Sequence, residues 1–253
     1  PRRSLPATPF SRRGVLWAFG WCGVGWFGTL LEWRRGVLPT VGLRFPGRGA
    51  DFLNSYITVE AEVETEGSFR RYRAVLTETV RRVAQRLSLD LKPDDATALV
   101  STIPYWPAFA DVGPALSELR REGWRFALLT NCDRDIIALT QRRLPVAFDA
   151  VVTAEDVAAY KPSPAHFLLF KSTFGASADS WIHVAQSYFH DIRPASELGI
   201  RRIWVNRQGE PDDPSIADAV VNGLAELPDA GKNHYPHSAR STDARETAHP
   251  GPA

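Results

Sequence analysis

The sequence predicts an α/β protein with a Rossmann-like, doubly wound parallel sheet and a helical cap inserted after the first strand. Apolar strands alternate with amphipathic helices from about residue 112 onward. A helical segment interrupts this alternation between about residues 36 and 110. Strands separated by helices imply right-handed crossovers and a parallel sheet, in which reactive groups gather at the carboxyl ends of the strands.

The periodicity of apolar residues places the elements of the core. Asp111 can cap the first core helix, Pro114 lies in its first turn, and Gly123 ends it. Further helices are expected at 134–143, from 163 onward, and at 194–198. Strands are expected just before Phe27 and at 125–129, 148–152, 181–185, 200–205 and 218–221.

The division into domains follows from where this alternation stops. Residues 14–35 and 108–229 are expected to form the α/β core, and residues 36–107 the helical cap, with helices at 50–64 and 69–87. The segment 104–107 is expected to be the return hinge, and its Trp106 either lines a pocket or packs between layers. Residues 1–13 are expected to be an extension and residues 230–253 a disordered tail, because the tail lacks apolar periodicity.

Composition excludes several classes of partner. The chain has 253 residues, 44% of them hydrophobic, and a net charge of +1, so we expect no nucleic-acid partner. Residues 14–31 are uncharged but contain five glycines, which make a poor membrane helix, so we expect no membrane partner. Two cysteines without metal-ligand spacing indicate a reducing, cytoplasmic location.

The sequence contains no methionine, so we expect a processed or truncated chain, or one that does not begin at the true start.

Four motifs occur in a fixed order along the chain. They are Phe27-Gly28-Thr29-Leu30, Thr130-Asn131, Lys161-Pro162 and the segment from Gln186 to Asp191. This set resembles the haloacid dehalogenase superfamily, in its metal-free 2-haloacid dehalogenase branch. The resemblance implies a hydrolase in which an aspartate attacks the carbon bearing the halogen and water then hydrolyses the ester. It implies no cofactor, and a cap that excludes water from the reaction.

The resemblance assigns catalytic roles to Thr130, Asn131, Lys161, Ser187 and Asp191. The lysine holds the nucleophile carboxylate, and the threonine and asparagine hold that carboxylate and the departing group. Asp191 orders the lysine or activates the hydrolytic water. Two of these residues have another reading, because Asn131 and Asp191 can each cap a following helix.

The substrate pocket is expected to be lined by Phe27, Gly28, Thr29, Tyr188 and Trp106. Its ligand is expected to be a small halogenated or other organic acid, and a homodimer is left open. Related phosphatases need several carboxylates for Mg²⁺. Gly25, Phe27 and Gln186 occupy the positions of those acids and leave only Asp191, so no metal site is expected.

Gly25 stands two residues before the aromatic of the first motif, where the family has its aspartate nucleophile. Glycine cannot attack, so we expect weak or absent turnover of 2-haloacids. The alternative is a non-catalytic or repurposed binding protein on the same fold, and direct activation of water by Asp191 is a further reading. Residues 1–26 also lack the β-branched run of a buried first strand, so this stretch is a candidate for non-native sequence. Around 55–57, where the family has a substrate-binding arginine, the sequence is Ser-Tyr-Ile.

Overall fold

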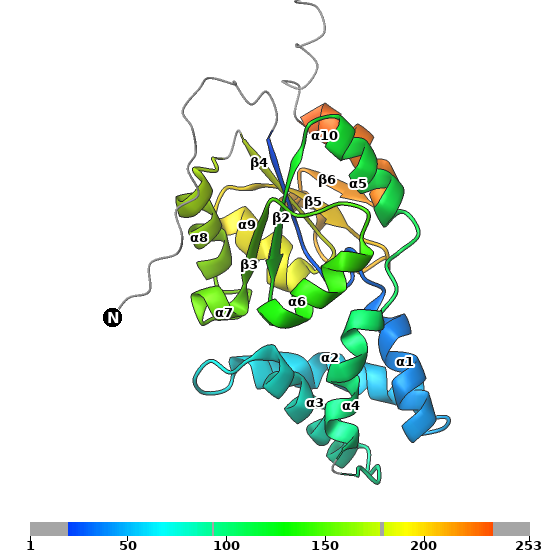
Figure 1. Ribbon diagram of the computed structural model, residues 1–253. Coiled ribbons are helices and arrows are strands. Elements are labelled where there is room, and N and C mark those ends of the chain that lie inside the picture. Colours follow the sequence, from blue (N-terminus) through cyan, green and yellow to red (C-terminus); the bar gives the residue numbers. More distant parts are fainter. Residues whose placement is uncertain (1–19, 93, 178–179, 235–253) are drawn as a thin grey trace, which may run out of the picture.

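The computed structural model describes residues 20–92, 94–177 and 180–234. Six parallel strands form one sheet in the order β3-β2-β1-β4-β5-β6 (Figure 1). Their bounds are β1 (Trp21–Val24), β2 (Arg125–Thr130), β3 (Ala150–Thr153), β4 (Trp181–Ala185), β5 (Arg201–Val205) and β6 (Ala219–Val221). The predicted doubly wound α/β class is confirmed.

The first strand lies in the middle of the sheet. β1 pairs with β2 on one side and β4 on the other, and all four of its residues are buried. The strand expected just before Phe27 is therefore present at residues 21–24, although only Val24 among them is β-branched. The residues before it up to 19, including the expected extension 1–13, lie outside the described residues. Because strand order reverses at β1, a crevice is expected at the carboxyl end of this strand.

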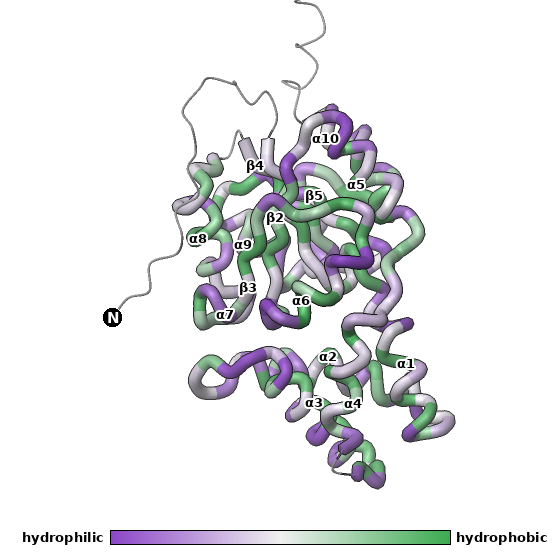
Figure 2. Tube along the Cα trace, in the orientation of Figure 1, coloured by the Kyte–Doolittle hydropathy of each residue, from purple (hydrophilic) through white to green (hydrophobic). Residues whose placement is uncertain are grey.

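Side chains of the strands alternate between two hydrophobic layers. Phe126 and Leu128 pack with the layer of α5 (Val112–Arg121), α6 (Arg134–Thr140) and α10 (Leu227–His234). Ala127 and Leu129 pack on the other face with α8 (Ala165–Phe174) and α9 (Arg193–Glu197). Figure 2 shows hydrophobic segments along the strands and hydrophilic segments on outer turns. The short helix α7 (Ala154–Val157) follows β3.

Four helices form an insertion between β1 and β2, and we call this segment the helical insertion. They are α1 (Trp33–Arg44), α2 (Gly49–Thr65), α3 (Tyr72–Arg86) and α4 (Asp95–Thr102). Figure 1 places them together beyond one edge of the core. The predicted helices at 50–64 and 69–87 correspond to α2 and α3.

Other elements depart from the sequence-based expectations. The helices α1 and α4 were not predicted, and α1 contains Pro39 and two glycines that lower its helix propensity. The expected helix 134–143 ends at Thr140 and continues as a 3₁₀ turn, and the strand expected from 148 begins at Ala150. The expected tail begins inside α10, and residues 235–253 lie outside the described residues.

The two chain segments that join the insertion to the core run side by side. The amide of Glu32 donates to the carbonyl of Pro107 at 2.8 Å, and the amide of Phe109 donates to the carbonyl of Leu30 at 3.1 Å. Between them Trp106 is 4% exposed, and its indole NH donates to Thr102 at 3.0 Å. Both linkers are therefore held by hydrogen bonds and by packing.

A buried carboxylate fastens the insertion to the core a second time. Asp133, fully buried after β2, accepts the backbone amides of Tyr72 and Arg73 at 2.7 and 3.1 Å. The Nε of Arg73 donates to the same carboxylate at 3.1 Å. The backbone amides in the first turn of a helix have no carbonyl of the same helix to donate to. In α3 two of these amides donate to Asp133 instead, which binds the first turn to the core.

Among the described residues, no helix is long and apolar enough to cross a membrane.

Two glycines of α1 give a matched test of how this helix packs. A Cβ on Gly36 would lie 2.2 Å from the Trp106 ring, whereas a Cβ on Gly42 would meet nothing within 4 Å. Gly42→Ala should stabilise the protein by up to about 1 kcal/mol through helix propensity. Gly36→Ala should destabilise it by about 1–3 kcal/mol through overpacking. Urea unfolding measures both, and equal effects would contradict this packing.

Candidate functional site

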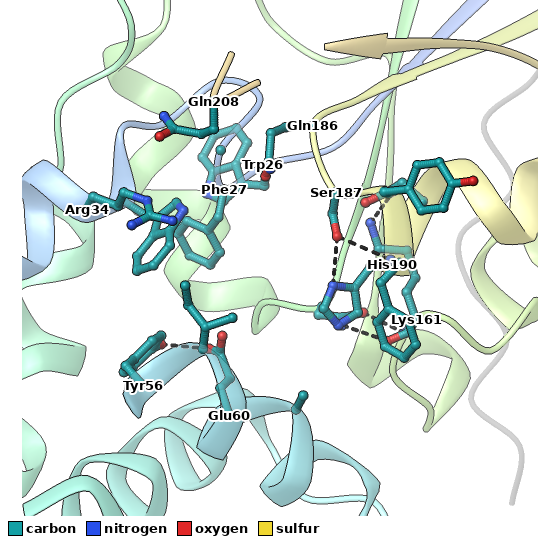
Figure 3. A pocket seen from close by; sticks show the side chains of 18 of the residues that line it. Trp26, Phe27, Arg34, Tyr56, Glu60, Lys161, Gln186, Ser187, His190 and Gln208 are labelled. Atoms are coloured by element: carbon teal, nitrogen blue, oxygen red, sulfur yellow. Dashed lines mark hydrogen bonds and ion pairs between the residues drawn. The ribbon is translucent and has the colours of Figure 1, made fainter. Parts of the chain in front are cut away.

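A cavity of about 750 Å³ lies between the helical insertion and the carboxyl edge of the sheet (Figure 3). Side chains of both parts line it, as expected for a ligand site at the strand ends of an α/β sheet. The predicted site residues found in its lining are Phe27, Gly28, Trp106, Thr130, Asn131, Lys161, Ser187, Tyr188 and Asp191. The structure therefore brings together nine residues from five separate stretches of the chain.

Two predicted positions are not among the described lining residues. Gly25 directly follows β1, and its amide donates to the carbonyl of Val184 at 3.0 Å. Thr29 is 1% exposed, and its hydroxyl accepts the amide of Gln186 at 2.9 Å. A Cβ on Gly25 would lie 2.9 Å from that hydroxyl and 3.2 Å from the Cβ of Ala185. Thr29 therefore supports the site from behind and does not contact the cavity.

Gly28 occupies a position that strongly favours glycine. Its φ of +75° is in the left-handed region, and a Cβ would lie 2.3 Å from the Oε1 of Gln186. The side-chain Nε2 of Gln186 in turn donates to the Oε1 of Glu210 at 2.7 Å. The turn after β1 is thus closed tightly against the loop that follows β4.

A buried ion pair forms the floor of the site. Lys161 and Asp191 are each 4% exposed, and the Nζ of Lys161 donates to the Oδ1 of Asp191 at 2.6 Å and to the carbonyl of Leu129 at 3.0 Å. The Nε2 of His183 lies 2.8 Å from the same Oδ1. Burial opposes ionisation of Asp191, but the charge of Lys161 and the hydrogen bonds from His183 and Lys161 hold its pKa below the usual range. Burial also lowers the pKa of His183, so this ring is neutral and donates to the carboxylate.

Asn131 joins the lysine loop to the helical insertion. Its Oδ1 accepts the backbone amide of Lys161 at 2.7 Å, and its Nδ2 donates to the carbonyl of Lys161 at 3.2 Å and to Glu64 at 3.3 Å. Its side chain makes no capping bond to α6, whose N-cap is Asp133. Thr130 uses its hydroxyl to accept the amide of Cys132 at 3.1 Å.

Aromatic rings form much of the wall of the cavity. Phe27 stacks on Tyr72 of α3 with ring centroids 5.8 Å apart and packs on Trp106 at 5.3 Å. Tyr188 packs edge-on against Trp204 at 5.3 Å. Trp106 therefore both lines the cavity and packs between layers, the two readings that its sequence left open.

The polar residues that line this cavity and that the sequence reasoning missed include Glu60, Glu64 and His190. The hydroxyls of Tyr56 and Tyr72 donate to Glu60 at 2.6 and 2.7 Å. Burial and then the charge of Glu64 raise the pKa of Glu60 to about 7. Glu60 and Glu64 are four residues apart on α2, so the signal in the sequence was a pair of acids on one helix face.

His190 bridges the loop after β4 and the insertion. Its Nδ1 lies 2.9 Å from the hydroxyl of Ser187, and its Nε2 lies 3.3 Å from the Oε2 of Glu64. Burial opposes protonation of His190, but its interaction with Glu64 outweighs burial and raises the pKa of the imidazole. The Glu64 side chain is only 6% exposed, so this contact lies away from water.

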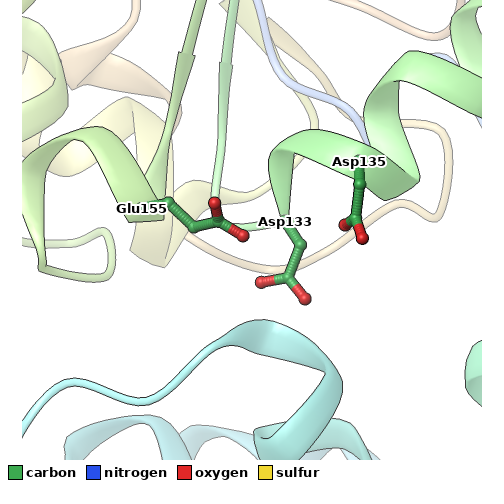
Figure 4. A group of neighbouring side chains, drawn as sticks. All are labelled: Asp133, Asp135 and Glu155. Carbon is green, nitrogen blue, oxygen red and sulfur yellow. The ribbon is translucent and has the colours of Figure 1, made fainter.

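Asp133, Asp135 and Glu155 form a group of acids with the spacing of metal ligands, the only one found among the described residues. Figure 4 shows them pointing from the core toward the insertion. Arg71 pairs with Glu155 at 2.7 Å and with Asp135 at 3.2 Å, and Arg73 pairs with Asp133 at 3.1 Å. The arginines already neutralise these acids, so the group joins the insertion to the core.

Comparison with known proteins places the chain in a family. The sequence profile of haloacid dehalogenase-like hydrolases matches residues 77–205, more than half of the chain. The protein belongs to the haloacid dehalogenase-like hydrolases. The match begins inside α3, so it does not include β1 or Gly25.

Relatives of this hydrolase carry more than one activity in their names. Haloacetate dehalogenase H-2 of Moraxella sp. (strain B) is 24% identical over 216 residues, which are 79% of this chain and 95% of the relative. Phosphatase MT3486 of Mycobacterium tuberculosis is 27% identical over 235 residues, 87% of this chain and 98% of the relative. The crystal structure of the L-2-haloacid dehalogenase RSc1362 superposes with a TM-score of 0.76 at 21% identity, covering 83% of this chain and 96% of the other. At this identity the superposition establishes the fold alone.

The buried pair predicts a strong dependence of stability on Asp191. Asp191→Asn leaves the Lys161 ammonium without its counter-charge and should cost about 3–5 kcal/mol of unfolding free energy. The control Asp51→Asn, in an exposed pair with Arg48 at 3.1 Å, should cost less than about 1 kcal/mol. Urea unfolding measures both.

The same pair predicts the direction of a pH effect. The pKa of Asp191 is lowered on folding, so its stabilisation is present above the unfolded value and is lost as pH falls through the folded value. The difference in stability between the native chain and Asp191→Asn should therefore be constant near neutral pH and shrink in acid. A difference that grew in acid would contradict this account of the pair.

Proposed function

We propose that this haloacid dehalogenase-like hydrolase has an assembled, metal-independent dehalogenase site without its nucleophile, and that it turns over 2-haloacids weakly or not at all. The observation that carries the proposal is Gly25, directly after the central strand. The structure of the L-2-haloacid dehalogenase of Xanthobacter autotrophicus with chloropropionic acid covalently bound superposes on this chain with a TM-score of 0.74 at 18% identity, covering 85% of this chain and 98% of the other. A covalent step needs a nucleophilic side chain, and glycine has none.

The rest of the site supports this reading. Lys161 and Asn131 occupy the positions at which the family lysine and asparagine act, and the helical insertion is in the place of the family's cap. The ammonium of Lys161 lies 2.6 Å from the carboxylate of Asp191, so it has an opposite charge beside it without an aspartate at position 25.

Direct activation of water by Asp191 is a weaker account. Lys161 and His183 both donate to the Oδ1 of this carboxylate, and its pKa is lowered. A carboxylate with a lowered pKa is a poor base, because a general base works best with a pKa near the working pH.

The donor chemistry at the strand ends also does not fit a Mg²⁺ ion. This ion takes oxygen ligands, usually carboxylates together with waters and phosphate. Gly25 and Phe27 offer no side-chain oxygen, and the Oδ1 of Asp191 is taken up by Lys161 and His183. We therefore favour a metal-independent site over the phosphatase activity named for some relatives.

The alternative is a non-catalytic or repurposed protein that binds a small molecule in this cavity. From α2 the cavity receives the carboxylates Glu60 and Glu64, together with the apolar Ile57. Arg34 of α1 also lines the cavity (Figure 3).

Chloride release from 2-chloropropionate separates the two readings. The native chain should show release at or near the blank, and Gly25→Asp should gain release because it supplies the nucleophile. Gly25→Asn has the same shape without the negative charge and should stay inactive. The new Cβ must displace Thr29 slightly, so thermal unfolding of Gly25→Ala controls for that strain.

The outcomes exclude one another. Release by the native chain at the rate of Gly25→Asp would show that the proposal is wrong. No release of chloride from either folded chain would favour the binding role.

A cytoplasmic location accords with the composition and is checked by fractionation of cells that express the protein.

A further inference from the structure

We propose that Ser187, His190 and Glu64 form a serine-type nucleophilic group in this cavity, able to cleave small uncharged esters by acyl transfer to Ser187. The inference concerns an activity separate from carbon–halogen hydrolysis and does not depend on position 25. It assigns chemistry to residues that the dehalogenase reading leaves without a nucleophilic role.

The distances form a continuous chain of contacts. The Ser187 hydroxyl lies 2.9 Å from the Nδ1 of His190, whose Nε2 lies 3.3 Å from the Oε2 of Glu64. The other oxygen of Glu64 accepts a hydrogen bond from Asn131 at 3.3 Å. All four residues line the same cavity, and Figure 3 shows Ser187 and His190 facing each other.

This arrangement has the parts of an activated serine, with the contact between His190 and Glu64 an ion pair at 3.3 Å rather than a hydrogen bond. A serine hydroxyl is a weak nucleophile until a neighbouring base can accept its proton, and the base needs a third group to orient it. His190 supplies the base and Glu64 the orienting carboxylate. Asn131 in turn fixes Glu64, which arrives from a different part of the chain, so the contact is not a product of local helix geometry.

The reaction balances with water as the second substrate. The Ser187 oxygen bonds to the ester carbonyl carbon while its proton passes to the Nδ1 of His190. Collapse of the tetrahedral intermediate breaks the carbon–oxygen bond of the ester, and His190 returns the proton to the leaving alkoxide. Water then attacks the acyl-serine with His190 as base, which releases the acid and restores the hydroxyl.

The lining of the cavity indicates the substrate class. Phe27, Tyr72 and Trp106 present aromatic surface, which accepts an apolar acyl group. Glu60 and Glu64 disfavour an anionic substrate by charge repulsion. Small neutral esters therefore fit better than carboxylates, and p-nitrophenyl acetate is a suitable probe.

Ser187 also has a structural role that the test must separate from catalysis. Its hydroxyl accepts the backbone amide of His190 at 3.2 Å and so caps the helical segment that follows. Asparagine is an equally good N-cap but no nucleophile. Ser187→Asn therefore keeps the cap and removes the proposed chemistry.

The decisive measurement is covalent labelling with a fluorophosphonate, with the modified peptide identified by mass spectrometry. We expect the full chain to be labelled at Ser187 and Ser187→Asn to lose that label. His190→Gln and Glu64→Gln should label, and hydrolyse p-nitrophenyl acetate, at least about tenfold more slowly, since general-base catalysis contributes about 10²–10⁴-fold. The control Glu62→Gln, on the surface of the same helix in a pair with Arg86, should behave as the native chain does.

Labelling of the native chain does not depend on whether any variant folds. This measurement alone can therefore contradict the proposal. Absence of label at Ser187 in the folded protein would overturn it. Label at Ser187 that is unchanged in His190→Gln and Glu64→Gln, with unfolding temperatures close to native, would also overturn it. Chloride release by Gly25→Asp is scored separately, so failure of one proposal leaves the other testable.

Discussion

The buried pair of Lys161 and Asp191 holds the functional edge of this protein together. Its ammonium bonds to the carbonyl of Leu129 at the end of β2, and its carboxylate belongs to the segment after β4. One interaction therefore ties together two strands that flank β1. Two charges this far from water are tolerated because each has its opposite charge and further hydrogen bonds, with His183 on the acid and Leu129 on the lysine.

The helical insertion depends on a second buried charge. Asp133 follows β2 by only a few residues and binds the first turn of α3 through two backbone amides. The same short stretch of chain thus carries Asn131, which contacts Glu64 of α2, and Asp133, which contacts α3. The position of the insertion over the cavity is consequently set from the end of β2.

Much of the core could be predicted from sequence because its signals are local. Buried strands such as 125–129 and 181–185 are short apolar runs bounded by turns, and the polar residues that follow them mark the strand ends. β1 was underrated because it contains Gly23 and only one β-branched residue, Val24, although parallel pairing on both sides accommodates this sequence. Tertiary contacts overrode propensity there, as they did in α1 around Pro39.

The site was predictable only where one segment carried the signal. Lys161 and Asp191 lie in short motifs with family spacing, whereas Glu64 meets His190 across 126 positions of the chain and no local pattern announces that contact. Thr29 shows the converse case. Thr29 belongs to a motif, yet its hydroxyl accepts the backbone amide of Gln186 and does not face the cavity.

Glu64 contacts residues of the core across the cavity, so entry of a ligand into the cavity and formation of these contacts are opposing requirements. Glu64 belongs to the insertion, whereas Asn131, Ser187 and His190 belong to the core, so a movement of the insertion away from the core would separate them. In the open state the carboxylate is hydrated, and closing must strip that water from a charge. Only a ligand that favours the closed state can offset this cost. Selectivity for a ligand would then depend on the closing equilibrium as well as on the fit of the closed cavity.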